Sequence, residues 1–296
     1  MPELPEVETV RRDLEDYLVG ASFTDVKFID FKNVAPEATF LAKYLEKAKV
    51  TALRRKGKLL IFDLEKAGDT DKHLLIHLKM TGQLVYQLGT QTKAGGHSLS
   101  ELDTKSAVGG DLPNKYTHAI FSFDSGGKLY FNDLRKFGYI KLSDTAELEK
   151  TLTANYGPEP LEKSFTLSWL TSILAKRTAP VKAVILNQKL IAGLGNIYAD
   201  EALFIAGINP GMKAHKIKPA KIEALHEAIV RVIKRAIKSR GTTFRNYVDG
   251  KGNKGSFIKF LQVYQRQKQP CLQCGETILK AKVAGRGTHY CPSCQK

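Results

Sequence analysis

The chain has 296 residues, of which 43% are hydrophobic, and a formal net charge of +16. This length suffices for two domains, and no stretch approaches the run of about 18 apolar residues that a membrane-spanning helix needs. Residues 1–150 contain 22 basic and 22 acidic side chains, so the whole excess of +16 lies in residues 151–296. A polyanionic partner is therefore expected to bind mainly the second half. The alternative is a charged, solvated surface without a partner.

The first predicted element is a helix that starts close to the amino terminus. Apolar residues recur every three or four positions from Leu4 to Leu14, which is the spacing of one helix face. The segment is acidic and amphipathic, unlike a signal peptide, so we expect a cytoplasmic protein. Removal of Met1 is expected because a small residue follows it, and Pro2 would then be a terminal secondary amine just ahead of the helix.

The chemistry of such a terminus depends on its protonation, because only a neutral amine attacks carbon. The reference pKa of an α-amino group is about 7.7–8.0 and that of lysine about 10.4, so a terminal amine is more often neutral at pH 7. The positive end of the helix lowers the pKa of the Pro2 amine, whereas the carboxylates of Glu3, Glu6 and Glu8 raise it. Pro2 is thus predicted to be a better Schiff-base nucleophile than an ordinary lysine. The alternative is that the glutamates are ordinary helix-start residues.

Short strands are predicted in the rest of the first half, with one helix at 40–48. Apolar residues at every second position indicate the strands Lys27–Phe31, Leu59–Leu64, Leu74–Leu78, Ala119–Phe123, Lys128–Phe131 and Tyr139–Leu142. Because no helices separate most of these strands, a β-sandwich or barrel is expected. The stretch between Gln87 and Lys115 is rich in Gly, Ser, Thr and Lys and predicts a long mobile loop.

The second half is predicted to be helical after a rigid segment at 157–160, which marks a domain boundary. Periodic apolar residues indicate the helices Phe165–Ala175, Pro180–Ala192, Ile197–Ala206 and Pro219–Arg240. Two glycines and Asn196 just precede the third helix. Such a helix start can bind an anion through backbone N–H groups, although Asn196 could also be a plain N-cap. Glycine-rich residues 241–260 predict a flexible loop.

All four cysteines lie near the carboxyl end, as two Cys-x2-Cys pairs sixteen residues apart: Cys271, Cys274, Cys291 and Cys294. This spacing is typical of a tetrahedral zinc ribbon. Two disulfides are the alternative, but they need an oxidising compartment. The ribbon strands are predicted at Ile278–Val283 and Thr288–Tyr290, with a turn at 284–287.

Several motifs resemble the bacterial formamidopyrimidine-DNA glycosylases (Fpg). The run P-E-L-P-E-V-E-T-V-R-R at residues 2–12 is highly specific to that family. The run Q-K-L-I-A-G-L-G-N-I-Y-A-D-E at 188–201 resembles the helix–two-turn–helix of Fpg and endonuclease VIII, and R-K-F-G at 135–138 resembles an Fpg loop. The resemblance covers nearly the whole chain outside residues 88–114.

This resemblance implies a glycosylase and abasic-site lyase that acts on oxidised purines, 8-oxoguanine and formamidopyrimidines, in duplex DNA. Pro2 would attack C1′ of the everted nucleotide, and β- then δ-elimination would follow. Glu3 would move protons, Glu6 would support the site, and Lys58 would contact the phosphate of the damaged nucleotide and assist catalysis. The partner would be damaged double-stranded DNA, bound by a monomer without a nucleotide cofactor or membrane. One structural zinc ion would be the only cofactor.

The same resemblance implies a set of DNA-contacting residues. Met80 and Phe137 would be wedges that fill the gap left by the extruded base, and Arg135 would face the orphaned cytosine. The remaining expected contacts, mostly with phosphates, are His77, Lys182, Asn196, Tyr264 and Arg286. The usual alternative for an apolar side chain at a tight turn is burial.

The chain departs from the family pattern at several positions. Lys115-Tyr116-Thr117-His118 replaces the typical K-H-D-H, so no role is assigned to the position of the missing first histidine. After Lys182, Ala183 stands where family members often have proline. After Tyr264, Gln265 stands where they have glycine. The loop from about residue 88 to 114 is also longer than in typical members.

The predicted fold class is α+β with several domains. Residues 1–150 are expected to form a catalytic β-sandwich with an amino-terminal helix, 151–262 a helix–two-turn–helix DNA-binding domain, and 263–296 a four-cysteine zinc finger. Two rival functions remain: an endonuclease VIII-like enzyme that prefers oxidised pyrimidines, and a non-catalytic DNA-binding zinc-ribbon protein. The second rival gives no reason for proline and glutamate at the terminus.

Overall fold

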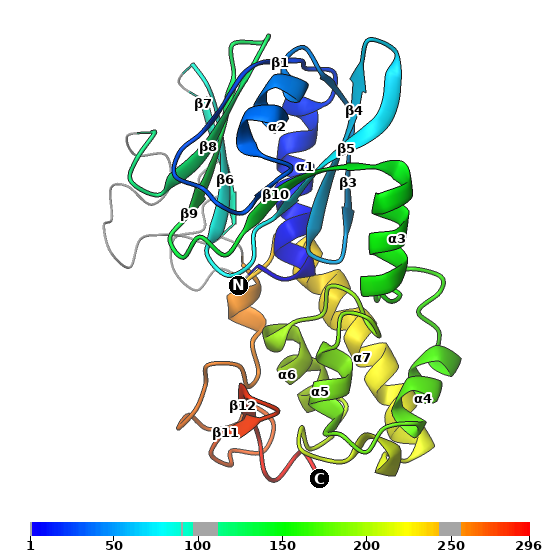
Figure 1. The fold of residues 1–296 in the computed structure, drawn as a ribbon. Helices are drawn as coiled ribbons and strands as arrows, with labels where there is room; N and C mark the ends of the chain where they lie inside the picture. Colours follow the sequence, from blue (N-terminus) through cyan, green and yellow to red (C-terminus); the bar gives the residue numbers. More distant parts are fainter. Residues whose placement is uncertain (1, 90, 97–111, 243–255) are drawn as a thin grey trace. The chain divides into compact units, whose positions relative to one another are not determined.

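The computed structural model describes residues 2–89, 91–96, 112–242 and 256–296. These residues form two compact units, each with its own apolar core (Figure 1). Unit 1 contains the described residues up to Leu152 together with Ser239–Thr242 and Ser256, and unit 2 contains Thr153–Lys238 and Phe257–Lys296. The four residues at 239–242 therefore rejoin the first unit after almost ninety residues of the second.

The predicted amino-terminal helix is α1 (Leu4–Leu18) in unit 1. Glu3 is its N-cap, and Pro5 lies in the first turn, where a missing N–H costs no hydrogen bond. The apolar residues spaced along one face, from Leu4 to Leu18, are buried. Burial of this stripe anchors the helix in the core and fixes where the chain's first residues lie.

Unit 1 also contains two five-stranded sheets, and α1 lies between them (Figure 1). The strands of one sheet, in spatial order, are β1 (Phe23–Phe28), β8 (Thr117–Phe123), β9 (Lys128–Asp133), β6 (Gly82–Leu88) and β7 (Gln91–Gly96). Those of the other are β2 (Val34–Ala35), β10 (Tyr139–Asp144), β5 (Asp69–His77), β4 (Leu59–Lys66) and β3 (Lys49–Lys56). Helix α1 contacts the edge strands β7 and β3, one from each sheet. The predicted β-sandwich with an amino-terminal helix is confirmed.

Three details of unit 1 differ from the sequence-based expectation. Residues 91–96, predicted as loop, form strand β7, which pairs with β6; the rest of that predicted loop, 97–111, lies outside the described residues. Helix α2 (Ala38–Leu45) ends earlier than predicted, because Lys47 adopts a left-handed φ of 65° and β3 begins two residues later. Helix α3 (Thr145–Asn155) was not predicted.

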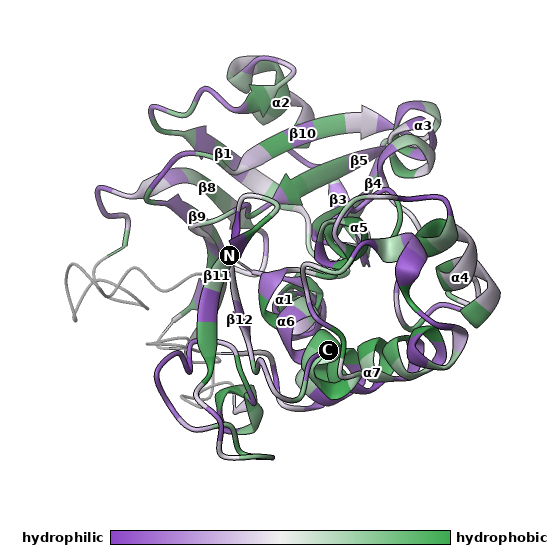
Figure 2. Cartoon of the chain, turned by 90° about the horizontal axis from the view of Figure 1, so that it is seen from below, coloured by the Kyte–Doolittle hydropathy of each residue, from purple (hydrophilic) through white to green (hydrophobic). Residues whose placement is uncertain are grey.

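Unit 2 is mainly helical. Its helices are α4 (Leu167–Ala175), α5 (Val181–Leu186), α6 (Asn196–Ile205) and α7 (Pro219–Lys238), with short 3-10 turns η1 (Ala214–Lys216) and η2 (Phe257–Phe260). Along α7, hydrophobic and hydrophilic residues alternate in the helical pattern, and the apolar face is buried (Figure 2). None of the described helices is both long and apolar enough to cross a membrane.

The second predicted helix of this unit is much shorter than expected, because α5 ends at Leu186 rather than Ala192. Asn187 is extended, and its carbonyl accepts backbone N–H groups from the two residues at 190–191. The Gln188 amide then bonds both Gly193 N–H and the Leu194 carbonyl, at 2.9 and 2.8 Å. These bonds form the two turns that separate α5 from α6, so the helix–two-turn–helix is present with a longer linker.

The carboxyl end forms a two-stranded ribbon of β11 (Leu279–Val283) and β12 (Arg286–Tyr290). Ala284 and Gly285 connect the strands with φ values of 48° and 77°, the signature of a two-residue hairpin turn. The turn is therefore shorter than the predicted 284–287. Arg286 belongs to the first position of β12, where it is exposed beside the hairpin tip.

Candidate active site and nucleic-acid interface

The start of α1 brings the predicted catalytic carboxylates together inside unit 1. Pro2, Glu3 and Glu6 are all buried. Glu3 and Glu6 form a reciprocal capping box, in which the backbone N–H of Glu3 donates to Glu6 Oε2 at 2.9 Å. The capping box fixes the direction in which the chain enters the helix, and it places the backbone of Pro2 and Glu3 in a defined position.

Glu6 also binds the segment that returns from the second half of the chain. Its Oε1 accepts the backbone N–H of Thr242 at 2.7 Å. Gly241 precedes that N–H with a φ of 80°, and a Cβ at this position would lie 2.7 Å from Glu6 Oε1. Only glycine fits both the left-handed backbone and this close approach. The carboxylate of Glu6 therefore joins the start of α1 to the segment at 241–242, in addition to binding Glu3.

Lys58 and His77 lie together at the ends of paired strands. Lys58 is buried in the turn between β3 and β4, and the next residue, Leu59, pairs with His77 across β4 and β5. Burial, followed by the positive charges of Lys79 and Lys58, lowers the pKa of His77 to about 3. His77 Nδ1 accepts the backbone N–H of Lys79 at 2.9 Å, so its proton lies on Nε2. The ring is neutral at physiological pH and can donate one hydrogen bond from Nε2.

A buried carboxylate whose supporting role was not predicted from the sequence stabilises this region. Glu8, two residues after Glu6 on α1, is 8% exposed and binds Arg11, Arg12 and Arg55 at 2.7–3.2 Å. Burial raises the pKa of Glu8, but hydrogen bonds from the three guanidiniums outweigh it and hold the pKa at about 2. Because Arg55 comes from β3, the cluster fastens α1 to the sheet that carries Lys58.

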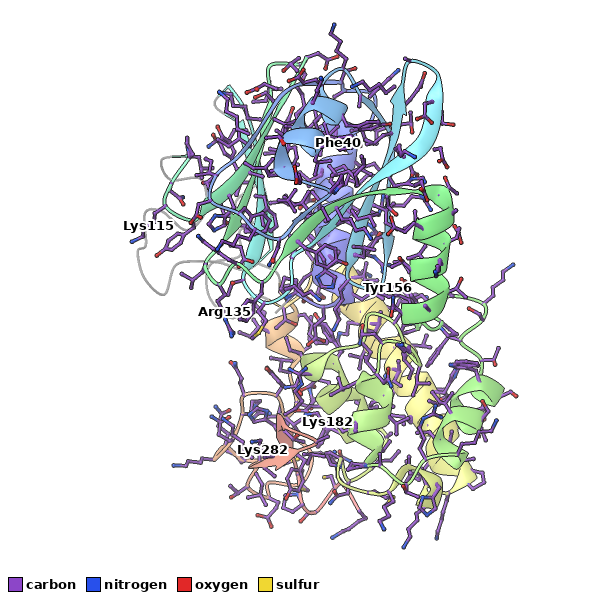
Figure 3. All side chains as sticks on the ribbon, viewed as in Figure 1. Phe40, Lys115, Arg135, Tyr156, Lys182 and Lys282 are labelled. Atoms are coloured by element: carbon purple, nitrogen blue, oxygen red, sulfur yellow. The ribbon has the colours of Figure 1, made fainter. Side chains whose placement is uncertain are left out.

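The predicted wedge residues and the predicted cytosine reader are neighbours in unit 1. Met80 and Phe137 are 38% and 50% exposed, so burial does not explain these apolar side chains. The guanidinium of Arg135 lies over the Phe137 ring, 4.4 Å from its centroid, and its Nη1 is 3.1 Å from the Met80 sulfur. Arg135 extends outward from its loop (Figure 3). The three side chains thus form one exposed cluster at the tips of two loops, the first connecting β5 to β6 and the second β9 to β10.

In unit 2 the structure gives Lys182 a position that corrects the expectation of a grip on phosphate. Its side chain has 0% exposure, and Nζ forms an ion pair with Asp200 at 2.6 Å. Nζ also donates to the Gly287 carbonyl and to Thr288 Oγ1, at 3.2 and 2.8 Å. Lys182 lies beside the ribbon (Figure 3). An ammonium without exposed surface, held by these groups, joins α5 and α6 to the ribbon rather than facing a phosphate in solution.

Asn196 on α6 and Arg286 on β12 are both neighbours of Gly287 in the ribbon. Asn196 is the first residue of α6 rather than its N-cap, which is Gly195, so the plain N-cap interpretation is wrong. Asn196 Nδ2 donates to the Gly287 carbonyl at 3.0 Å, and Arg286 is the neighbour of Gly287 in β12. The positive end of α6 therefore lies next to the ribbon segment that carries the exposed Arg286.

A second buried acid, Glu201, orders the segment that carries Tyr264. The Glu201 carboxylate accepts three successive backbone N–H groups, from Gln262, Val263 and Tyr264, at 2.8–3.0 Å. Burial raises the pKa of Glu201 despite these bonds. The Tyr264 ring meets the His289 ring edge-on, with 5.0 Å between centroids. Tyr264 is half-buried as a result, next to the ribbon.

The four cysteines fit a single zinc ion. Their Sγ atoms all lie within 4.8 Å of one another, with 3.9 Å between Cys271 and Cys294 and 3.5 Å between Cys274 and Cys291. A tetrahedron with Zn–S bonds of about 2.3 Å needs edges of about 3.8 Å, whereas a disulfide would bring two sulfurs to about 2.05 Å. The predicted zinc site is confirmed, and the alternative of two disulfides is wrong. Four thiolates complete the coordination of the ion, so its role is structural.

Comparison with known proteins covers the whole chain. Three family models match: the formamidopyrimidine-DNA glycosylase N-terminal domain at residues 1–140, the formamidopyrimidine-DNA glycosylase H2TH domain at 156–248, and the zinc finger found in FPG and IleRS at 268–296. The formamidopyrimidine-DNA glycosylase of Pelotomaculum thermopropionicum is 42% identical, with 100% of this chain and 99% of that protein covered. The chain belongs to the formamidopyrimidine-DNA glycosylase family.

Other members of the family agree with this assignment. The formamidopyrimidine-DNA glycosylase of Desulfitobacterium hafniense is 39% identical, with both chains covered completely. A solved complex between Lactococcus lactis Fpg and DNA that contains an abasic site has a TM-score of 0.86 at 35% identity, with 99% of both chains covered. A complex of the same protein with Fapy-dG DNA has a TM-score of 0.84 at 34% identity. The resemblance predicted from the motifs is confirmed.

For this Fpg-family chain, two supporting acids were not predicted, although the sequence contains a recognisable signal for them. Asp200 and Glu201 are adjacent acids in the otherwise apolar helix α6, and such acids require buried partners. Glu8 had a weaker signal, because Arg11 and Arg12 lie three and four residues later on the same helix face. Its third partner, Arg55, is 47 residues away and could not be inferred from local spacing.

Proposed function

We propose that the protein is a DNA glycosylase that excises oxidised purines, 8-oxoguanine and formamidopyrimidines, from duplex DNA and cleaves the resulting abasic site. The observation that carries the proposal is the full-length match to Fpg proteins, together with solved relatives bound to abasic-site and Fapy-dG DNA. Abasic-site cleavage through a proline Schiff base is typical of this family. The roles of individual residues below are part of the proposal.

Pro2 is the proposed nucleophile. After removal of Met1, its neutral secondary amine attacks C1′ of the everted nucleotide, and the bond from C1′ to the base breaks. Opening of the sugar ring breaks the C1′–O4′ bond and leaves an iminium ion between C1′ and the Pro2 nitrogen. Removal of a C2′ proton expels the 3′-phosphate, a second elimination expels the 5′-phosphate, and hydrolysis of the iminium restores Pro2. The product is a one-nucleotide gap.

Glu3 handles protons in this scheme. A carboxyl group next to the nucleophile can donate a proton to O4′ as the ring opens and can accept one later. Its burial in the capping box with Glu6 supports this role, because the box fixes the carboxyl of the residue that directly follows Pro2. Glu6 acts as the supporting carboxylate that positions both residues.

Lys58 and His77 are proposed to bind the phosphates next to the damaged nucleotide. The pKa of His77, lowered to about 3, indicates a neutral donor, so Lys58 supplies the charge and His77 a directed hydrogen bond. In unit 2, Asn196, Arg286 and Tyr264 are proposed as further DNA contacts. Lys182 serves them indirectly by fixing the ribbon against the start of α6.

Met80 and Phe137 are proposed to fill the space that the everted base leaves, and Arg135 to face the unpaired cytosine. A guanidinium has donors that match the acceptor edge of cytosine. Stacking on Phe137 holds the guanidinium plane in place, which supports this assignment.

The proposed organisation follows the three matched regions. We propose the division 1–150, 151–262 and 263–296, supported by family-model matches at 1–140, 156–248 and 268–296. The zinc ion stabilises the last part. We also propose a monomer that works in the cytoplasm, where a cluster of reduced thiolates persists.

The experiment that tests this function compares excision from duplexes that contain 8-oxoguanine opposite cytosine, an oxidised pyrimidine, or no lesion. We expect strand cleavage at 8-oxoguanine with phosphates at both ends of the gap. Cleavage confined to the oxidised pyrimidine would favour the endonuclease VIII-like alternative. Binding without any cleavage would favour the non-catalytic alternative.

A further inference from the structure

Asp133 is a buried acid to which no catalytic or DNA-contacting role has been given above. It is the last residue of β9, immediately before the loop that carries Arg135 and Phe137, and it has 0% exposure. On β6 it pairs with Gly82, which ends the loop that carries Met80. Asp133 therefore lies at the point where the two wedge loops leave the sheet.

The carboxylate of Asp133 binds both loops at once. Its Oδ1 accepts the Thr81 hydroxyl from the first loop and the backbone N–H of Arg135, at 3.1 Å, from the second. Its Oδ2 accepts the backbone N–H of Gly138 at 2.7 Å, at the far end of the second loop. The bond from the Arg135 N–H to the side chain of Asp133, two residues earlier, forms an Asx turn, which aspartate favours.

Thr81 connects the two loops a second time. Its Oγ1 accepts the backbone N–H of Arg135 at 3.1 Å while its hydroxyl donates to Asp133. Thr81 is buried and follows Met80 directly. Displacement of one loop relative to the other would break both bonds of this hydroxyl.

All three donors to the carboxylate are neutral groups at fixed positions of the loops. Hydrogen bonds to an ionised acceptor are about twice as strong as neutral ones, and a buried carboxylate that loses them carries a large desolvation cost. The second loop is closely packed where it ends, since a Cβ on Gly138 would lie 2.6 Å from the Phe131 ring and 3.1 Å from Asp133 Oδ2. The carboxylate thus binds both loops in the arrangement that the structure shows.

We propose that Asp133, together with the Thr81 hydroxyl, is a positioning group that sets Met80, Arg135 and Phe137 in their gap-filling arrangement before DNA binds. This inference rests on the proposed function. Pre-organised loops lose less conformational entropy on binding, and the backbone of the cytosine-facing residue is held by two oxygen atoms. The consequence is specificity for the base opposite the lesion, rather than the bond-breaking chemistry itself.

The test compares Thr81→Val and Asp133→Asn with Thr81→Ser, which keeps the hydroxyl. The first readout is the ratio of kcat/KM for 8-oxoguanine opposite cytosine to that opposite adenine. Thr81→Val should lower the ratio about tenfold, because it removes both hydrogen bonds of the buried hydroxyl. Asp133→Asn should lower kcat/KM on the cytosine duplex about 100-fold, because it misplaces both loops. Single-stranded DNA has no opposite base, so the rate at which Thr81→Val and Asp133→Asn cleave an abasic site in it should differ from the wild-type rate by less than about threefold.

The second readout does not need catalysis. The fluorescence of 2-aminopurine placed next to an abasic-site analogue in a duplex rises when side chains unstack it. The wild type and Thr81→Ser should raise the fluorescence equally, and Thr81→Val should raise it less. Thr117→Val is the matched control, because it removes a buried hydroxyl bonded to Asn132 at 2.8 Å, next to Asp133, without touching either loop.

Equal losses in Thr81→Val and Thr117→Val on all substrates would overturn the inference, since both hydroxyls would then be merely structural. An unchanged opposite-base ratio and unchanged fluorescence in Thr81→Val would also overturn it. If Asp133→Asn fails to fold, Thr81→Val still decides. A wild type that unstacks 2-aminopurine but excises no base would contradict the proposed function alone, and the fluorescence comparison would still test the positioning role.

Discussion

Glu8 illustrates at the scale of one residue how opposing effects decide the charge of a buried group. Burial alone would favour a neutral carboxyl, but hydrogen bonds from Arg11, Arg12 and Arg55 lower its pKa to about 2. Glu15 offers a contrast on the same helix, because it pairs with Arg11 at 2.7 Å but is 44% exposed. Water screens such an exposed pair, so it contributes little to stability.

We predict that Glu8→Gln lowers the free energy of unfolding at pH 7 by roughly 3 kcal/mol. This is the free energy that corresponds to lowering the pKa of a glutamate from about 4.3 to about 2 on folding. A depressed pKa stabilises the fold above the unfolded value and loses that contribution as the pH falls towards 2. Urea unfolding at several pH values should therefore show the wild type and Glu8→Gln converging between pH 5 and 2. Glu15→Gln should cost less than about 1 kcal/mol, and equal effects of the two substitutions would contradict the account.

At this scale the motifs predicted the candidate catalytic residues but not their environment. The sequence placed Glu3 and Glu6 three residues apart, and that spacing is the capping box seen in the structure. No local pattern relates Glu8 to Arg55 or Glu6 to Thr242, which are 47 and 236 residues apart. Such long-range partners depend on the packing of whole elements.

At the scale of elements, the ribbon and the helix–two-turn–helix form a joint assembly within unit 2. Lys182 on α5, Asp200 on α6 and the backbone at Gly287 on β12 meet in one buried group. The backbone N–H of His289 also donates to Asp200, at 2.9 Å. The sequence identified each element separately, but it assigned Lys182 to phosphate because the burial of a lysine depends on partners that spacing does not reveal.

We predict that Asp200→Ala destabilises the protein by about 3–5 kcal/mol, because it leaves the Lys182 ammonium buried without its counter-charge. The double variant Lys182→Met/Asp200→Leu should recover most of that loss in thermal unfolding, since it removes both charges. A direct phosphate role for Lys182 makes a different prediction. In that case the double variant would fold well yet bind DNA with a clearly lower salt dependence than the wild type.

The zinc ribbon allows a second prediction at this scale. Structural zinc contributes about 10–16 kcal/mol in small fingers, far more than two short strands could supply. Cys274→Ser should therefore unfold the ribbon, release zinc in a colorimetric assay and weaken DNA binding, because Arg286 loses its position. Gln273→Ser, at the neighbouring exposed position, should leave the zinc content unchanged. Full zinc retention by Cys274→Ser would contradict the four-thiolate site.

At the scale of the whole molecule, composition and motifs together predicted the family, the β-sandwich, the helical part and the zinc finger. The basic excess in residues 151–296 fits a protein whose relatives bind DNA. The return of Ser239–Thr242 to the first unit could not be predicted. It depends on Arg240, whose Nη2 lies 2.6 Å from both carboxylate oxygens of Asp13, a pairing that only the folded chain reveals.

In the proposed reaction, the amine of Pro2 forms a covalent bond with the sugar of the damaged nucleotide. Borohydride trapping on a duplex with 8-oxoguanine opposite cytosine tests it most directly, after intact-mass measurement has established whether Met1 is removed. We expect a stable protein–DNA adduct whose cross-linked peptide begins at Pro2, and loss of that adduct in Pro2→Gly or when Met1 is retained. An adduct on another residue, or full-rate cleavage by a protein with a blocked terminus, would contradict it.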